Sequence, residues 1–262
     1  MTVLRYLAFA TLLWAMGCGG GGSGQPAPSP TSPSSTSWQY TALGDSLAVG
    51  ILAVTGYVPR YQQYLESDNR VTVSLSDLGQ NGWMSSDLLN AIRNDPAMRS
   101  AVMNAQVVTF DIGGNDLLHA RRLFLEGSCG GSDNQDCLRA AVSGFLTNWD
   151  SIVAEILALR SPATTIVRTM DVYNPFVGID KAAGRFALLD QYLEPINAHI
   201  AQSAVRNQIP FAKVHQVFNG TAGDEDPIAK GYISPDGVHP NDNGHKIIAD
   251  LLRALGYAPL HQ

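Results

Sequence analysis

The sequence reads Thr41-Ala-Leu-Gly-Asp-Ser-Leu-Ala-Val-Gly50 where its first strand-like apolar run ends in a glycine, an aspartate and a serine. Such a run is typical of a buried strand that leads into a turn. A serine at that turn can serve as a nucleophile, although a hydroxyl there is just as able to cap a helix. Ser46 therefore becomes a catalytic candidate only if other segments supply a base, an orienting acid and oxyanion donors.

The chain alternates short apolar runs with segments of helical spacing, the runs lying at residues 38–43, 71–75, 106–112, 165–172 and 209–214. Val107-Val-Thr-Phe110 is one run with the composition of a strand buried on both faces. The clearest helical spacing lies between Phe145 and Leu159, and a last helix is expected to begin near Asn241, a good capping residue. This alternation predicts the α/β class, with about five parallel strands and helices on both faces of the sheet.

Composition narrows the class of protein. The 262 residues carry a net charge of −6, and 45% of them are hydrophobic, which suits an ordinary globular domain. The mild acidity argues against nucleic-acid binding, which usually leaves a basic stripe. No repeat and no second linker divides residues 38–262, which we interpret as a single domain.

The first 37 residues differ in character from the rest. Residues 1–17 have one early arginine, Arg5, and then an apolar run, the pattern of a signal peptide that is too short to span a bilayer. The ending Ala15-Met16-Gly17-Cys18 resembles a bacterial lipobox, which predicts lipidation of Cys18; plain secretory cleavage is the alternative. Residues 18–37 are rich in Gly, Pro and Ser, the composition of an unfolded tether. We therefore expect an exported protein, anchored to a membrane through Cys18.

Two further cysteines, Cys129 and Cys137, lie in a polar, glycine-rich segment. In an exported protein a disulfide between them is favoured, and it would stiffen a surface loop. Zinc is the rival interpretation, but no pair of histidines lies near these cysteines. We expect no metal and no cofactor.

Polar residues follow the predicted strands at the positions where parallel sheets gather their functional groups. Gly44-Asp45-Ser46 follows the first strand, a segment containing Gly82 follows the second, and Gly113-Gly114-Asn115 follows the third. The last such segment, Ser234 to Pro240, contains Asp236 and His239. A hydroxyl, a glycine turn, an amide and an Asp/His pair are thus expected at one edge of the sheet.

These groups make up the parts of a serine hydrolase. His239 is the candidate base for Ser46, and Asp236 can orient its ring by binding the other nitrogen. Candidate oxyanion donors are the backbone N–H groups of Ser46 and Gly82 and the side-chain amide of Asn115. Taken singly, Gly82 is better explained by a tight turn.

The chain resembles the GDSL, or SGNH, hydrolases in four blocks that span residues 44–240, namely Gly44-Asp-Ser-Leu47, Gly82, Gly113-Gly-Asn-Asp116 and Asp236-Gly-Val-His-Pro240. The resemblance implies a flavodoxin-like three-layer α/β/α sandwich. It also implies a nucleophile at Ser46, a base at His239, an acid at Asp236, and oxyanion donors at Gly82 and Asn115. No Gly-x-Ser-x-Gly elbow is present, and the one Gly-x-Gly-x-x-Gly match lies in the tether.

We therefore expect a serine esterase that cleaves carboxylic esters through an acyl-enzyme. Its substrate would be a small-molecule or lipid ester, as for a lipase or lysophospholipase, and a carbohydrate O-acetyl ester is the alternative. A non-catalytic binding module and an acyltransferase remain rivals. Trp83 and the cystine segment are the expected pocket walls. A metal site at Asp242 and His245 is disfavoured, because polar groups are ordinary in a first helical turn.

Overall fold

The computed structural model describes residues 36–260. The expected signal peptide at residues 1–17, the lipidation site Cys18, nearly all of the tether at 18–37, and His261 lie outside the described residues. Within the described range, no helix is long and apolar enough to cross a bilayer.

The described residues form one five-stranded sheet in the order β2-β1-β3-β4-β5, and every neighbouring pair is parallel. The strands are β1 Ser37–Leu43, β2 Thr72–Asp77, β3 Val107–Phe110, β4 Ile166–Met170 and β5 Phe211–Ala212. The predicted parallel sheet is thus confirmed. The last strand is much shorter than the apolar run at 209–214, because Pro210 has no N–H for a ladder and Val214 already begins a helix.

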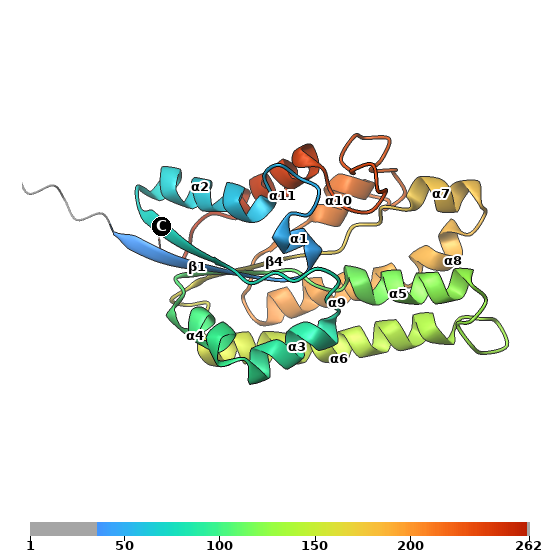
Figure 1. Cartoon of the computed structure of the whole chain (residues 1–262), viewed down its shortest axis with the longest axis horizontal. Coiled ribbons are helices and arrows are strands. Elements are labelled where there is room, and N and C mark those ends of the chain that lie inside the picture. The colour runs from blue at the N-terminus through green and yellow to red at the C-terminus, as the bar shows by residue number, and fades with distance from the viewer. Residues whose placement is uncertain (1–35, 261–262) are drawn as a thin grey trace, which may run out of the picture. The chain divides into compact units, whose positions relative to one another are not determined.

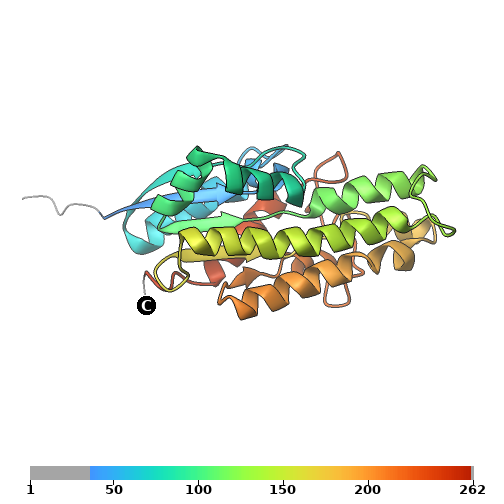
Figure 2. The ribbon, with the colours of Figure 1, turned by 90° about the horizontal axis from the view of Figure 1, so that it is seen from below.

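Helices cover both faces of the sheet (Figure 1). Their bounds are α1 Ser46–Val49, α2 Tyr57–Asn69, α3 Ser85–Asn94, α4 Pro96–Asn104, α5 Gly114–Leu125, α6 Asp136–Leu159, α7 Val177–Ala182, α8 Phe186–Asp190, α9 Leu193–Arg206, α10 Val214–Asn219 and α11 Asp242–Ala254. Figure 2 shows α6 running the length of one face, with α3 and α9 on either side of it. The α/β/α sandwich is therefore the observed architecture.

Each face of the sheet carries its own hydrophobic core. Tyr40 of β1 packs with Tyr61 of α2 and Ile248 of α11 on one face. On the opposite face, Leu43 of β1 belongs to the cluster that holds Trp149 of α6. Both expected helices are present, and the Asn241 side chain accepts hydrogen bonds from the N–H groups of Asn243 (3.0 Å) and Gly244 (3.1 Å). Successive strand residues point to opposite faces, so one strand anchors both helical layers.

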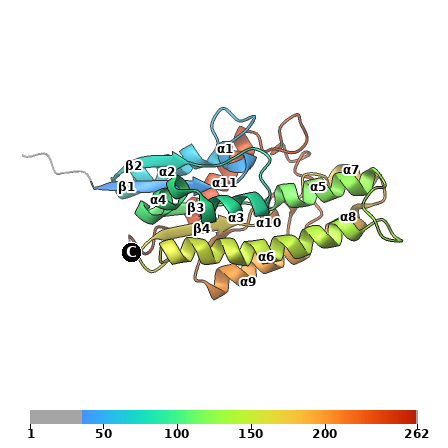
Figure 3. The same cartoon turned by 60° about the horizontal axis from the view of Figure 1, so that its bottom comes forward.

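One end of the molecule extends beyond the sheet. Figures 1 and 3 show α5, α7 and α8 projecting past the carboxyl ends of the strands, on the side where α1 begins. Reacting groups of open parallel sheets gather at that end.

Candidate active site

Ser46 is placed by a sharp turn at the end of β1. Gly44 has φ +154°, and a Cβ there would lie 2.6 Å from Oδ2 of Asp111, so only glycine fits. The Asp45 carboxylate then caps α1 by accepting a hydrogen bond of 2.9 Å from the N–H of Leu47. Ser46 is the first residue of α1 and is buried, which fixes its hydroxyl at the carboxyl edge of the sheet.

The structure joins Ser46, His239 and Asp236 in a hydrogen-bonded chain. Nε2 of His239 lies 2.9 Å from Oγ of Ser46, and Nδ1 of the same ring lies 2.5 Å from Oδ2 of Asp236. The imidazole is thus engaged on both nitrogens, with a hydroxyl on one side and a carboxylate on the other. This is the arrangement in which a histidine can take a proton from a serine while the carboxylate sets its tautomer.

The loop before α11 holds this histidine in place. Oδ1 of Asp236 accepts hydrogen bonds of 3.1 Å from the N–H groups of both Val238 and His239, around a turn in which Gly237 has φ +75°. The Tyr173 hydroxyl donates to the carbonyl of Val238 at 2.7 Å. Burial opposes ionisation of Asp236, but the hydrogen bonds from His239 and the backbone outweigh it and lower the pKa of Asp236.

Asn115 lies beside this chain, in the first turn of α5. Its Nδ2 donates to Oδ2 of Asp45 at 3.2 Å and to the carbonyl of Trp83 at 2.9 Å. Gly113 precedes it with φ +118°, and a Cβ there would lie 2.5 Å from the Phe145 ring. The amide is therefore held near Ser46 by two acceptors and by a turn that needs glycine.

Gly82 does not line the pocket beside Ser46. It occupies an exposed turn at φ +78°, and a Cβ built on it would meet no atom within 4 Å. Its link to the other groups runs through the neighbouring Trp83, whose carbonyl accepts from Asn115. A backbone donor role for Gly82 stays a prediction.

A pocket of about 120 Å³ extends from Ser46 and His239 along α5. Its walls are mainly apolar and include Leu117, Leu118, Leu138, Phe176, Leu189 and Leu193. Trp83 does not line the pocket, so that expectation is wrong: its half-buried side chain packs against the core cluster that includes residues of α3 and α6. The walls come instead from α5, α8 and α9 and from the segments beside them.

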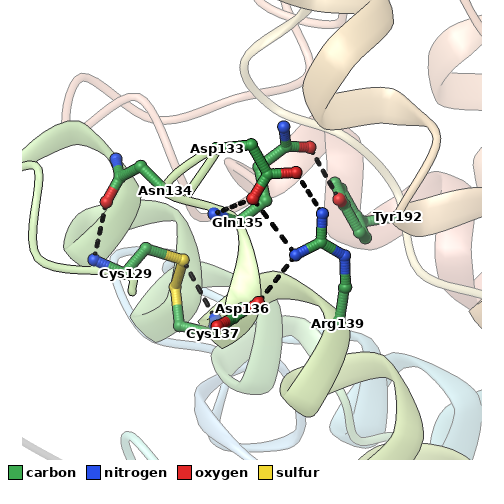
Figure 4. Close-up of polar contacts among 8 residues, drawn as sticks. All are labelled: Cys129, Asp133, Asn134, Gln135, Asp136, Cys137, Arg139 and Tyr192. Carbon is green, nitrogen blue, oxygen red and sulfur yellow. Dashed lines mark hydrogen bonds and ion pairs between the residues drawn. A yellow bond between two sulfur atoms is a disulfide. The ribbon is translucent and has the colours of Figure 1, made fainter. Parts of the chain in front are cut away.

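The cystine segment supports one of these walls from behind. Cys129 and Cys137 form the expected disulfide, but neither residue lines the pocket. Figure 4 shows the contact between the segment and the wall, where the hydroxyl of the wall residue Tyr192 donates to Oε1 of Gln135 at 2.7 Å. Arg139 pairs with Asp133 in the same segment. The disulfide thus braces a loop that positions a wall.

Comparison with known proteins agrees with this geometry. The model of the GDSL-like lipase/acylhydrolase family matches residues 42–247, which hold all five candidate site residues. The chain belongs to this family. The spore germination lipase LipC of Bacillus licheniformis is 32% identical over 227 residues, covering 85% of this chain and 98% of that protein. The protein YpmR of Bacillus subtilis is 30% identical, over 79% of this chain and 77% of its own.

Solved structures show the same fold as this GDSL-family chain. The lipase Lip_vut3 from a goat rumen metagenome superposes with a TM-score of 0.72 at 30% identity, covering 86% of this chain and all of that one (100%). Axe2, an acetylxylan esterase from Geobacillus stearothermophilus, gives a TM-score of 0.60 at 20% identity, over 85% and 95% of the two chains. The family relationship makes the chain a carboxylic ester hydrolase.

Tyr57 and Asp111, two buried residues near the nucleophile of this GDSL-family protein, were not identified from the sequence. The Tyr57 hydroxyl donates to Oδ2 of Asp111 at 2.5 Å, and the backbone N–H of Asp45 lies 3.5 Å from Oδ1 of Asp111. Burial raises the pKa of Asp45 to about 6 and the pKa of Asp111 well above its usual range. The sequence feature that could have pointed to Asp111 is its position as a charged residue inside the apolar run at 106–112.

His245 and Asp242, the disfavoured metal pair, have other partners. Nδ1 of His245 accepts from the N–H of Tyr57 at 3.2 Å, and Asp242 accepts from the N–H of Thr55 at 3.0 Å and pairs with Arg60. Burial lowers the pKa of His245 to about 4. In the described part of the GDSL-family chain, no group of three or more His, Cys, Asp or Glu side chains is placed to hold a metal ion.

Proposed function

We propose that the chain hydrolyses esters of apolar acids by a serine mechanism in which Ser46, His239 and Asp236 act together. The observation that carries this proposal is the continuous hydrogen-bonded chain of 2.9 Å and 2.5 Å through the two nitrogens of His239. The apolar pocket beside Ser46 favours a lipid-type ester over an acetylated carbohydrate. The names of LipC and Lip_vut3 as lipases agree with this preference.

Each group has one task in the proposed reaction. Oγ of Ser46 attacks the ester carbonyl carbon while Nε2 of His239 takes its proton, and Asp236 stabilises the imidazolium. The bond to the alcohol oxygen then breaks, and His239 returns the proton to that oxygen, which leaves an acyl-serine. Water then attacks the acyl-serine while Nε2 of His239 takes its proton; the bond between the acyl carbon and Oγ breaks, and His239 returns the proton to Oγ, which releases the carboxylic acid and restores Ser46. The amide of Asn115 stabilises the oxyanion in both steps when the substrate oxygen takes the place of Asp45, at 3.2 Å the more distant of its two acceptors.

The direct test compares wild type with Ser46→Ala on p-nitrophenyl butyrate. We expect the variant to lose at least a factor of about 10³ in kcat, since only the oxyanion site and binding remain. Ser67→Ala, at an exposed serine of α2, is the matched control and should keep full activity. Equal turnover by wild type and Ser46→Ala would refute the mechanism.

Pre-steady-state kinetics separate the rivals. A burst of p-nitrophenol equal to the enzyme concentration is expected from an acyl-enzyme, whereas a binding module would release none. Adding an alcohol acceptor and measuring transfer against hydrolysis distinguishes an acyltransferase. Acetylated xylan, tested in parallel, should be a poorer substrate than p-nitrophenyl hexanoate.

We also propose that the protein is exported and lipid-anchored through Cys18. The leader-like residues 1–17, the tether at 18–37 and the Cys129–Cys137 disulfide support an oxidising compartment outside the cytoplasm. The test is the intact mass of the mature protein from a bacterial membrane fraction. Diacylglycerol on Cys18 as first residue is expected, and a Cys18→Ala variant should leave the membrane fraction.

A further inference from the structure

A charged cluster lines part of the otherwise apolar pocket. Two nitrogens of the Arg121 guanidinium in α5 donate hydrogen bonds to the Asp180 carboxylate of α7. Nη2 lies 2.6 Å from Oδ1, and Nε lies 3.4 Å from Oδ2. Both residues line the pocket, and their side chains are only 16% and 2% exposed. Arg185 pairs with the same carboxylate at 2.7 Å. The cluster is a built feature of the pocket rather than a surface ion pair.

The position of Arg121 is fixed on three sides. Besides the fork to Asp180, its guanidinium carbon lies 3.9 Å from the centre of the Phe176 ring, a cation–π contact. Its backbone belongs to α5, which packs along α6. A guanidinium held in this way does not swing aside at low cost to admit an apolar group.

Helix α5 sets the length of the pocket. Gly114, Leu117, Leu118 and Arg121 all line it, and their spacing of three, four and seven residues places them on one face of the helix. Asn115 and Arg121 are six residues apart, so the pocket runs for roughly 9 Å between the oxyanion donor and the charged cluster. An extended chain advances roughly 1.2 Å per single bond, so this length holds an acyl group of about six to eight carbons.

The pocket receives the acyl group rather than the alcohol. The leaving oxygen must lie next to Nε2 of His239, which returns the proton, and the His239 and Asp236 side chains are on the more open side, 23% and 30% exposed. The carbonyl oxygen must face Asn115, from which α5 leads into the pocket. The alcohol can then leave toward solvent while the acyl chain lies along α5.

We propose that Arg121, held by Asp180, is the specificity-determining end wall that limits the acyl group to medium length. The inference rests on the proposed ester hydrolysis at Ser46. A longer acyl chain would press methyl and methylene groups against the buried Arg121 guanidinium. The guanidinium would then lose its remaining solvation or its hydrogen bonds to Asp180, and either loss opposes binding. A shorter chain leaves apolar wall uncovered, so both sides of the optimum lose binding energy.

The experiment measures kcat/KM on p-nitrophenyl acetate, butyrate, hexanoate, octanoate, decanoate and laurate. Wild type should be fastest on hexanoate or octanoate. In Arg121→Ala the ratio of laurate to hexanoate should rise about tenfold or more, because a single methylene in a pocket is worth at least that factor. Asp180 keeps Arg185 as its partner in this variant, so its charge is not orphaned. Arg122→Ala is the matched control, since Arg122 is next along α5 but exposed and absent from the pocket.

Three results would overturn the proposal: an unchanged laurate ratio in Arg121→Ala, the same rise in Arg122→Ala, or a wild-type optimum at acetate or laurate. A second series keeps acetate as the acyl group and lengthens the alcohol. If Arg121→Ala changes the kcat/KM ratios in this series and not in the acyl series, the pocket binds the alcohol and the proposal is wrong. If Arg121→Ala does not fold, Arg121→Met supplies the same test with an apolar, adaptable side chain. Failure of the serine mechanism is separate, because it shows as retained activity in Ser46→Ala.

Discussion

Nε2 of His239 lies 2.9 Å from Oγ of Ser46, although 193 positions separate the two residues along the chain. The contact forms because Ser46 follows β1 directly while His239 precedes α11, the helix that packs beside α2 on the same face of the sheet. A local turn centred on Gly237 then aims the ring back at the end of β1. The parallel sheet therefore assembles groups from distant segments at one edge.

Asp236→Asn should lower kcat by roughly 10³ to 10⁴ with little change in KM, since an amide favours the wrong imidazole tautomer. The measurement is steady-state kinetics on p-nitrophenyl butyrate. Asp224→Asn, which removes an exposed carboxylate paired with Lys181, is the control and should remain fully active. A loss below tenfold in Asp236→Asn would mean that Asp236 does not orient His239.

Asn115→Ala should lower kcat by roughly 10² to 10³, because one fixed oxyanion donor is lost. KM should change less than kcat, since the oxyanion develops only in the transition state. Asn104→Ala, at the exposed end of α4, is a neutral comparison. If KM rises while kcat stays constant, Asn115 binds substrate rather than the oxyanion.

Gly44→Ala should destabilise the fold by about 2 to 3 kcal/mol, because the new Cβ overlaps a packed neighbour and the backbone is unfavourable for alanine. The overlap is with Oδ2 of Asp111 at 2.6 Å, and φ is +154°. Urea unfolding measures the change. Gly144→Ala in α6 is the opposite case: its Cβ meets nothing within 4 Å, and we expect a gain of about 0.5 to 1 kcal/mol. Equal effects of the two substitutions would contradict this account.

His245 should make the fold less stable in mild acid. Its pKa is lowered to about 4 in the folded state by burial, whereas an unfolded histidine has a pKa of about 6.5. Between those values the unfolded chain binds a proton that the folded chain does not, so stability falls as pH drops through this window. The loss from this group is about 2 kcal/mol between about pH 7 and pH 4.5.

Urea unfolding of wild type and His245→Asn at both pH values measures this contribution as a difference. Asn can still accept the hydrogen bond from the N–H of Tyr57 that Nδ1 accepts at 3.2 Å. The variant should therefore show a smaller loss of stability in acid than wild type. Asp45 acts in the opposite sense, because its folded pKa is raised to about 6, and it is common to both proteins. Equal pH dependence would rule out His245 as the titrating group.

Local chemistry determined the elements. Apolar runs of strand length, helical spacing in residues 145–159 and the capping side chain of Asn241 all predicted structure that is present. The run at 209–214 was overestimated because apolar residues lie on both sides of Pro210, which interrupts the ladder. The hydrophobic pattern of a sequence predicts which residues are buried, but it does not show whether each backbone N–H can join a strand ladder.

The candidate nucleophile and amide were predictable because they stand in short segments directly after β1 and β3, and parallel topology brings such segments together. The base and acid were predictable from a short turn just before α11, far beyond the end of β5. Tertiary packing decided the rest. It packed Trp83 against the core cluster instead of the pocket, it set Asp111 against Gly44, and it paired Arg121 with Asp180 across two helices. A pocket wall is made by side chains from elements far apart in the chain, so their distances depend on how helices pack and not on any local pattern.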